Sequence, residues 1–235
     1  MGLFKKIKKA LKKAWNAVKA TARAIFRIVI EVIVRVIKII TYRVPVKRKM
    51  RYQILVLRNE LGNPLLDDAG LKNLQNQVYE TIKIFKDKFD IDLIPYEKPG
   101  IETLPTSAPP AALEVECGSG AASNEWGEAG AYFANNLAGW NGIPVSLGFP
   151  ISVFVVREIG DKWGCSLGPL TDYVTLSIDG ATKSLTTIAH EMGHACCLRH
   201  RDNSKNLMYS KSSRGTDVTG WQKFVVRTSR HCTMG

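Results

Sequence analysis

The chain has 235 residues, of which 45% are hydrophobic and 23% are charged, a composition that excludes a disordered or collagen-like protein. This length suits one domain with an appendage and allows a sizeable buried core. The five cysteines are too few for a disulfide scaffold, and their odd number leaves at least one thiol without a partner in the same chain.

The net charge of +12 comes from one end of the chain. Residues 1–51 contain 16 lysines and arginines and a single acid, Glu31. They therefore carry more than the whole net charge, and the rest of the chain is close to neutral. The net charge therefore indicates what kind of partner the N-terminal arm binds and indicates nothing about the partner of the remaining chain.

Residues 3–40 are predicted to form one long amphipathic helix, because apolar side chains recur with helical spacing for about ten turns. Up to Arg23 the basic and apolar faces are well separated. Beyond Arg23 the polar face narrows to a stripe of four charges, Arg27, Glu31, Arg35 and Lys38. The apolar face opposite consists of Phe4, Ile7, Leu11, Trp15, Val18, Ala22, Ile25, Val29, Val32 and Val36.

A transmembrane span over residues 24–40 is disfavoured. Its apolar residues contribute roughly −4 to −8 kcal/mol, whereas its four charges cost about +10 to +14 kcal/mol. An anionic membrane surface is therefore the expected partner of residues 3–40. Three alternatives stay open: the apolar face packs on the rest of the chain or on a second copy, the β-branched stretch Ile28–Ile40 is a strand, or the arm is a removable pro-segment.

Nucleic acid is not expected as a partner, because Trp15 is a lone aromatic residue on the apolar side and offers no stacking platform. The arm also lacks an uncharged apolar core followed by a cleavage site, so no signal peptide is predicted. Lys6 stands where N-myristoylation requires serine or threonine. We therefore expect peripheral membrane association, or secretion by a route that uses no signal peptide.

The remaining chain predicts an α+β fold with a small twisted mixed sheet. We divide the chain into a basic helical arm (1–48) and one further domain (49–235). Residues 97–112 contain four prolines and are predicted as a loop, and residues 117–148 as an irregular insertion with one helix. The predicted strands are Tyr52–Arg58, Ile91–Pro95, Ile151–Arg157 and Tyr173–Ile178. The predicted helices are 69–88, about Thr182–Cys197, and about Val218–Thr228.

Chemistry-bearing residues concentrate in the segment H-E-M-G-H that begins at His190. His190 and His194 are four residues apart, so on a helix both imidazoles project from one face and can bind one ion. Glu191 is rotated by about 100° from His190, which lets it reach the open side of the ion without being a ligand. There it can take a proton from a zinc-bound water. This pattern predicts a Zn²⁺ site with Glu191 as the catalytic base.

The third ligand is less constrained. His200 lies six residues after His194 and can join the site only if the helix ends and the chain turns back. Asp217, Asp202 or a cysteine are the alternatives. Asp217 is expected instead to cap, or to lie in the first turn of, the C-terminal helix.

The spacing H-E-x-x-H-x-x-x-x-x-H resembles that of the metzincin metallopeptidases, whose pattern continues to a methionine turn. Asn206-Leu207-Met208-Tyr209 fits that turn, and its spacing is most similar to the matrixin branch. The resemblance implies that His190, His194 and His200 bind zinc. It also implies that Met208 forms a hydrophobic floor beneath them, and that the upstream elements follow the order of a metzincin-like domain.

The chain departs from the family pattern at three positions. Cys197 replaces the glycine that lets the chain leave the helix with positive φ, Arg201 matches no subgroup signature, and Ser210 replaces a proline. A residue other than glycine in that conformation costs about 1–2 kcal/mol, so the turn at Cys197 is predicted to be strained.

The cysteines give further hypotheses. A Cys117 thiolate could occupy the open zinc position and keep an enzyme latent. Disulfides such as Cys117–Cys165 or Cys197–Cys232 are the alternative in an oxidising compartment. The segment Cys165–Leu170 is predicted to hold the peptide backbone of a substrate by β-augmentation.

The sequence therefore predicts a zinc-dependent endopeptidase that acts on proteins or peptides. The alternative is a membrane-active or anchoring protein whose zinc site is structural or inactive.

Overall fold

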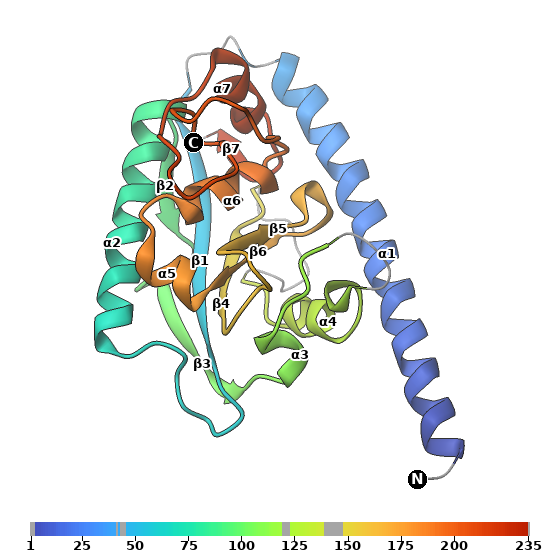
Figure 1. Cartoon of the computed structure of the whole chain (residues 1–235). Helices are drawn as coiled ribbons and strands as arrows, with labels where there is room; N and C mark the ends of the chain where they lie inside the picture. The colour runs from blue at the N-terminus through green and yellow to red at the C-terminus, as the bar shows by residue number, and fades with distance from the viewer. Residues whose placement is uncertain (1–2, 41, 43–45, 119–122, 139–147, 235) are drawn as a thin grey trace.

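The computed structural model describes residues 3–40, 42, 46–118, 123–138 and 148–234 (Figure 1). A long N-terminal helix, α1 (Leu3–Ile40), lies along one side of a body in which helices flank a mixed sheet. The α+β class and the helix over residues 3–40 agree with the sequence prediction. The alternative that Ile28–Ile40 forms a strand is wrong.

The sheet is built around the long strand β1 (Arg48–Arg58). Its strand order is β2-β1-β4-β6-β5. The strands beside β1 in this order are β2 (Asp92–Pro95), β4 (Ile151–Val156), β6 (Tyr173–Ser177) and β5 (Gly164–Ser166). The pairs β2–β1, β1–β4 and β4–β6 are parallel, whereas β5 pairs antiparallel with β6. Two further strands pair with β1: β3 (Ile101–Ser107) is parallel and β7 (Cys232–Met234) is antiparallel.

Side chains of β1 alternate between two buried apolar clusters, as the two-residue period of a strand requires. Ile54 and Val56 pack with residues of α2 and α6, whereas Leu55 and Leu57 pack with residues of α3 and α4. All six residues of β4 are buried, which explains the continuous apolar run that predicted this strand.

The helices of the body are short except for α2 (Asp68–Ile84), which Asp67 caps by accepting a hydrogen bond from the N–H of Gly70 at 2.8 Å. A π-helical turn, η1 (Phe85–Phe89), continues it. The other helical elements are α3 (Pro110–Leu113), η2 (Asn124–Trp126), α4 (Glu128–Asn135), η4 (Gly168–Leu170), α5 (Ile178–Lys183), α6 (Thr187–Ala195) and α7 (Gly220–Arg227).

The predicted helix from Thr182 to Cys197 is wrong, because the chain forms two helices there, α5 and α6, with a break between them. Ser184 makes this break: its backbone is extended, and its hydroxyl oxygen accepts the N–H groups of Thr186 and Thr187, both at 3.2 Å. A serine that bonds to nearby backbone in this way competes with helix continuation.

The prediction of a loop over residues 97–112 is also wrong, since β3 and α3 lie within it. Pro105 falls at a register shift between Val56 and Arg58 of β1, a place where a strand tolerates proline. The insertion 117–148 contains the predicted helix as α4, with residues 119–122 and 139–147 outside the described part. Thr219, not Asp217, caps α7, and it does so in a capping box with Gln222.

In the part of the chain that the structure describes, no helix is both long and apolar enough to cross a membrane.

Candidate metal centre

Three histidines meet at the C-terminal end of α6. His190 and His194 lie on successive turns of this helix, and His200 follows after the chain has turned back. The Nε2 atom of His194 lies 3.1 Å from Nε2 of His190 and 3.1 Å from Nε2 of His200. The three side chains thus present one nitrogen each to a common point, and they form a group able to hold a metal ion.

The hydrogen bonds of two of the rings show that the Nε2 atoms of His190 and His194 face each other as lone pairs. Nδ1 of His190 lies 2.8 Å from the carbonyl oxygen of Leu207, and Nδ1 of His194 lies 2.7 Å from that of Leu198. A carbonyl oxygen only accepts, so each Nδ1 carries the hydrogen and each neutral ring leaves Nε2 as an acceptor. Acceptors at 3.1 Å repel one another unless a cation lies between them. Two nitrogens about 2.0–2.1 Å from a tetrahedral zinc are about 3.3 Å apart, so the spacing fits this ion.

The protonation of the rings suits a metal ligand. Burial, together with the positive charge of Arg214, lowers the pKa of His190 to about 3 and that of His194 to about 4. Burial also lowers the pKa of His200. All three imidazoles are therefore neutral at pH 7, the form that coordinates a metal.

Glu191 lies beside the histidines and is buried. It lines a cavity of about 590 Å³ together with His190, His194 and His200. Burial raises the pKa of Glu191 to about 8, against the opposing effect of Arg214 and Lys162. The carboxylate fits because β5 has a glycine here: a Cβ on Gly164 would lie 2.7 Å from Cγ of Glu191. The side chain of Glu191 thus approaches the backbone so closely that only glycine fits at position 164, a requirement that the sequence did not reveal.

Met208 lies beneath the histidine helix, fully buried. A Cβ on Gly193 would lie 2.7 Å from its sulfur, so the methionine packs directly against the backbone between the two helical histidines. The adjacent residue, Leu207, supplies the carbonyl that orients His190. Met208 therefore packs against α6 below the histidines, while Leu207 orients one ring; the role of Met208 as the floor of a metal site stays a prediction.

The helix α6 ends in a Schellman motif, which brings His200 back to the site. The N–H of Leu198 donates to the carbonyl of Gly193 at 3.0 Å, and that of Cys197 donates to His194 at 2.8 Å. Cys197 has φ of 75°, the left-handed conformation predicted for it. This residue therefore holds a strained backbone at the position where His200 depends on the turn.

Cys197→Val is expected to destabilise the fold by about 2 kcal/mol, since a β-branched residue is worst suited to positive φ. It should also weaken metal binding, because His200 follows the turn. Cys197→Gly relieves the strain and should keep both properties. Chemical unfolding together with metal titration of the two variants tests this. Equal stability of the valine and glycine variants would show that the turn is not strained.

The other predicted ligands lie elsewhere or are engaged. Asp217 pairs with Lys88 at 3.1 Å, Asp202 is exposed, and neither belongs to a metal-binding group among the described residues. Cys117 forms a disulfide with Cys165, so the predicted disulfide is confirmed and the thiolate-ligand hypothesis is wrong. The alternative pair, Cys197 and Cys232, is not bonded, and both residues carry free thiols.

Further residues serve the site without any signal in the sequence pattern. Arg214 lines the cavity and donates from Nε to the carbonyl of Tyr209 at 3.1 Å. Gln77, buried on α2, donates to the carbonyl of Gly180 at 2.8 Å and accepts the N–H of Ile188 at 3.3 Å, which ties α5 and α6 to α2.

The predicted substrate segment Cys165–Leu170 is divided in the structure. Its first two residues belong to β5, the last strand in the sheet order, and Gly168–Leu170 is a 3₁₀ turn. Residues 163–166 line the same cavity as the histidines. A sheet edge therefore lies beside the candidate metal centre.

Comparison with known proteins gives little further information. No protein-family model matches the chain, and no curated protein matches it. A crystal structure of metalloproteinase-II from Bacteroides fragilis is similar at 13% identity, with a TM-score of 0.48. The likeness covers 78% of this chain and 56% of the other, so this chain spans little more than half of that protein's length. Such a weak likeness identifies neither fold nor function, and the function proposed below depends on the geometry of the site.

Proposed function

We propose that this chain is a zinc-dependent endopeptidase with a metzincin-like centre. The observation that carries the proposal is the convergence of three imidazole nitrogens, with Nε2 of His194 3.1 Å from each of the other two, in a cavity that a buried glutamate also lines. Three protein ligands leave a tetrahedral ion one open position, which is the arrangement of catalytic zinc and not of closed structural sites.

His190, His194 and His200 hold the metal through Nε2 in this proposal. A zinc ion bound there supplies a Lewis acid and lowers the pKa of water at its open position to about 7. Glu191 takes the proton from the attacking water on a carboxylate oxygen and passes it to the leaving amine. This role needs the carboxylate form of Glu191, which the positive charge of a bound metal ion would favour against the effect of burial on its pKa.

The substrate in this proposal is a protein or peptide in extended conformation. β5 ends the described strand order and borders the cavity, so a peptide backbone can add to the sheet beside the metal. Arg214 and Lys162 both line this cavity and make its electrostatic potential positive next to the histidines.

The decisive experiment measures zinc in purified wild-type protein and in His200→Ala by elemental analysis. One zinc per wild-type chain is expected, with loss or marked weakening in the variant, because two imidazoles hold the ion less firmly than three. His231→Gln is a matched control: His231 is also buried, but its Nδ1 bonds to the carbonyl of Phe149, away from the site. This control should keep its zinc.

Unchanged zinc in His200→Ala would contradict the three-histidine site and the metzincin-like assignment. Zinc in the wild type without hydrolysis of any protein or peptide substrate would favour the alternative, a membrane-active or anchoring protein with a structural metal site.

A further inference from the structure

The long helix α1 turns its polar stripe, not its apolar face, toward the body. Arg27, Glu31 and Lys38 are all buried, and each contacts residues near position 172 or 230. Apart from Ala24 and Val34, the described side chains of α1 that are buried belong to this stripe. The usual orientation of an amphipathic helix on a globular body is thus reversed.

The central part of the contact is a buried network of charges. Arg27 Nε lies 2.5 Å from Asp172 Oδ2, and Arg230 Nη2 lies 2.6 Å from Asp172 Oδ1. Glu31 pairs with Arg35 and accepts the backbone N–H of Arg230 at 3.0 Å. Every charge here has an opposite charge beside it, the condition under which ionised groups are buried.

The end of the stripe binds the C-terminus of α7. Arg35 Nη1 donates to the carbonyl of Val225 at 3.0 Å and to the hydroxyl of Thr228 at 2.9 Å. Lys38 Nζ donates to the carbonyls of Ser229, at 2.6 Å, and Cys232. Cations at this end of a helix interact favourably with its dipole and satisfy its last carbonyl groups.

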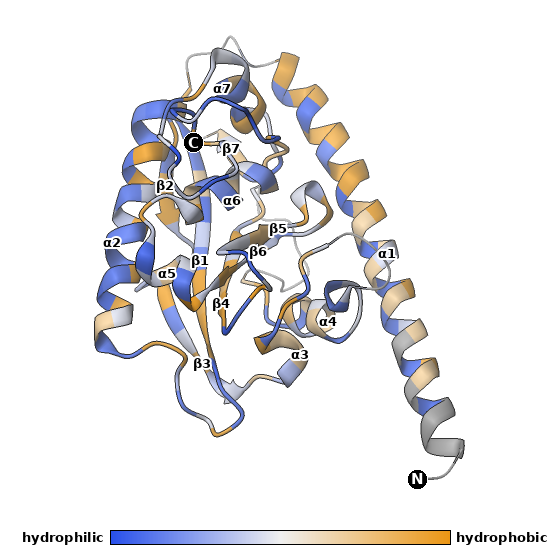
Figure 2. Cartoon of the chain, viewed as in Figure 1, coloured by the Kyte–Doolittle hydropathy of each residue, from blue (hydrophilic) through white to orange (hydrophobic). Residues whose placement is uncertain are grey.

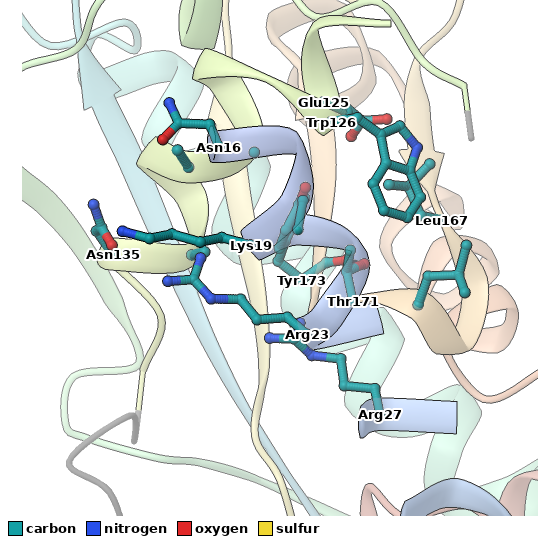
Figure 3. A pocket seen from close by; sticks show the side chains of 15 residues that line it. Asn16, Lys19, Arg23, Arg27, Glu125, Trp126, Asn135, Leu167, Thr171 and Tyr173 are labelled. Carbon is teal, nitrogen blue, oxygen red and sulfur yellow. Dashed lines mark hydrogen bonds between the residues drawn. The ribbon is translucent and has the colours of Figure 1, made fainter. Parts of the chain in front are cut away.

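Nearer the N-terminus the contact is polar as well. Figure 3 shows Lys19, Arg23 and Arg27 of α1 around a cavity of about 90 Å³ that is lined from the body by Trp126 and Tyr173, among others. The inward face of α1 is therefore mainly polar and charged, and specific ionic partners fix its position more than apolar packing does.

The apolar face of α1 consequently points into solvent, where Figure 2 shows apolar residues along the helix. Of the 18 large apolar side chains that are exposed among the described residues, 13 lie on this one helix. An apolar surface of this extent marks an interaction site. Its members are Leu11, Trp15, Val18, Ile25, Phe26, Ile28, Val29, Val32, Ile33, Val36, Ile37, Ile39 and Ile40.

We infer that this outward face of α1 docks on the surface of an anionic lipid bilayer, while the buried charge network holds the body to the docked helix. The helix would lie in the plane of the interface with its apolar face among the acyl chains. This inference does not depend on the proposed peptidase activity.

Charge selects a bilayer over a second copy of the chain as the occupant. Residues 3–22 contain seven lysines and no acid. Two parallel copies would bring these lysines together, and two antiparallel copies would place them on the apolar half of the partner helix. An anionic bilayer instead accepts the lysines at its headgroups and the apolar face below them. Lys8 and Lys12 are exposed and available for this contact.

Co-sedimentation of the full-length protein with vesicles tests the inference. We expect binding to phosphatidylcholine vesicles that contain about 30% phosphatidylglycerol, which gives them an anionic surface. Val29→Asp/Val36→Asp places two carboxylates on the outward face and should weaken binding at least tenfold. Both positions are exposed, so the fold should persist. Tyr79→Asp/Leu185→Asp makes the same change at exposed residues of the body and should bind as the wild type does.

The charge contribution is tested separately with Lys8→Glu/Lys12→Glu, which should weaken binding to the anionic vesicles by tenfold or more. Equal binding of the wild type to neutral and anionic vesicles would overturn the anionic specificity. Unchanged binding of the Val29→Asp/Val36→Asp variant would overturn the docking face. A concentration-dependent dimer that this variant abolishes, without any vesicle binding, would assign the face to a second copy instead.

Discussion

Replacing Glu191 by glutamine is expected to lower the kcat of peptide hydrolysis by about 10²–10⁴-fold while the metal stays bound. Glutamine keeps the shape that Gly164 accommodates, but it cannot accept the proton of the attacking water. The three histidines are unchanged, so zinc content should remain that of the wild type. Turnover of an internally quenched peptide, with zinc determined on the same sample, measures both properties.

Glu125→Gln is the matched control for this prediction. Glu125 is also a buried carboxyl group, and burial raises its pKa to about 7. Its carboxylate contacts the N–H of Gly118 and the disulfide sulfur of Cys165 and does not line the histidine cavity. Its substitution should therefore change kcat less than tenfold. Activity retained in the Glu191 variant, or lost equally in both variants, would contradict the role of Glu191 as the base.

The histidine cluster was predictable because its determinants are local. The spacing of His190 and His194 fixes two imidazoles on one helix face, and Cys197 stands where the turn needs positive φ. All three histidines lie within the eleven residues from His190 to His200, so helix geometry and one turn suffice to predict that His200 lies near the other two. The supporting residues Gly164 and Gln77 come from distant elements, and no local pattern relates them to the histidines.

The orientation of α1 was not predictable from its periodicity. A hydropathy pattern shows which faces a helix has, but the partners that decide which face is buried lie elsewhere in the chain. Asp172 and Arg230 are 145 and 199 residues away from the α1 residues that they bind, Arg27 and Glu31. The expectation that the apolar face packs on the body is wrong for the described residues, because this charge network occupies the contact. The membrane surface as a partner stays a prediction.

Asp172→Asn is expected to destabilise the protein by about 3–5 kcal/mol, because it removes the acid between two buried arginines. Arg27 and Arg230 would then face each other without the carboxylate that separates them. Urea unfolding at pH 7 measures the change. Asp92→Asn, which breaks the exposed pair with Lys86, is the control and should unfold almost as the wild type does. Similar midpoints for both variants would contradict the structural importance of the network.

The same carboxyl group predicts how stability depends on pH. Burial alone would raise the pKa of Asp172, but Arg230 and Arg27 outweigh it and lower that pKa to about 2. A group whose pKa is lower in the folded state contributes stability above its unfolded pKa of about 4 and loses it as the pH falls through the folded value. The difference between wild type and Asp172→Asn should therefore be largest near neutral pH and shrink between about pH 4 and pH 2. A difference that stays constant over this range would show that the asparagine variant is destabilised by lost packing and not by lost charge. Because Arg27 belongs to α1, a difference that does shrink would show that the ionised form of Asp172 stabilises the protein through its pairs with α1 and with Arg230.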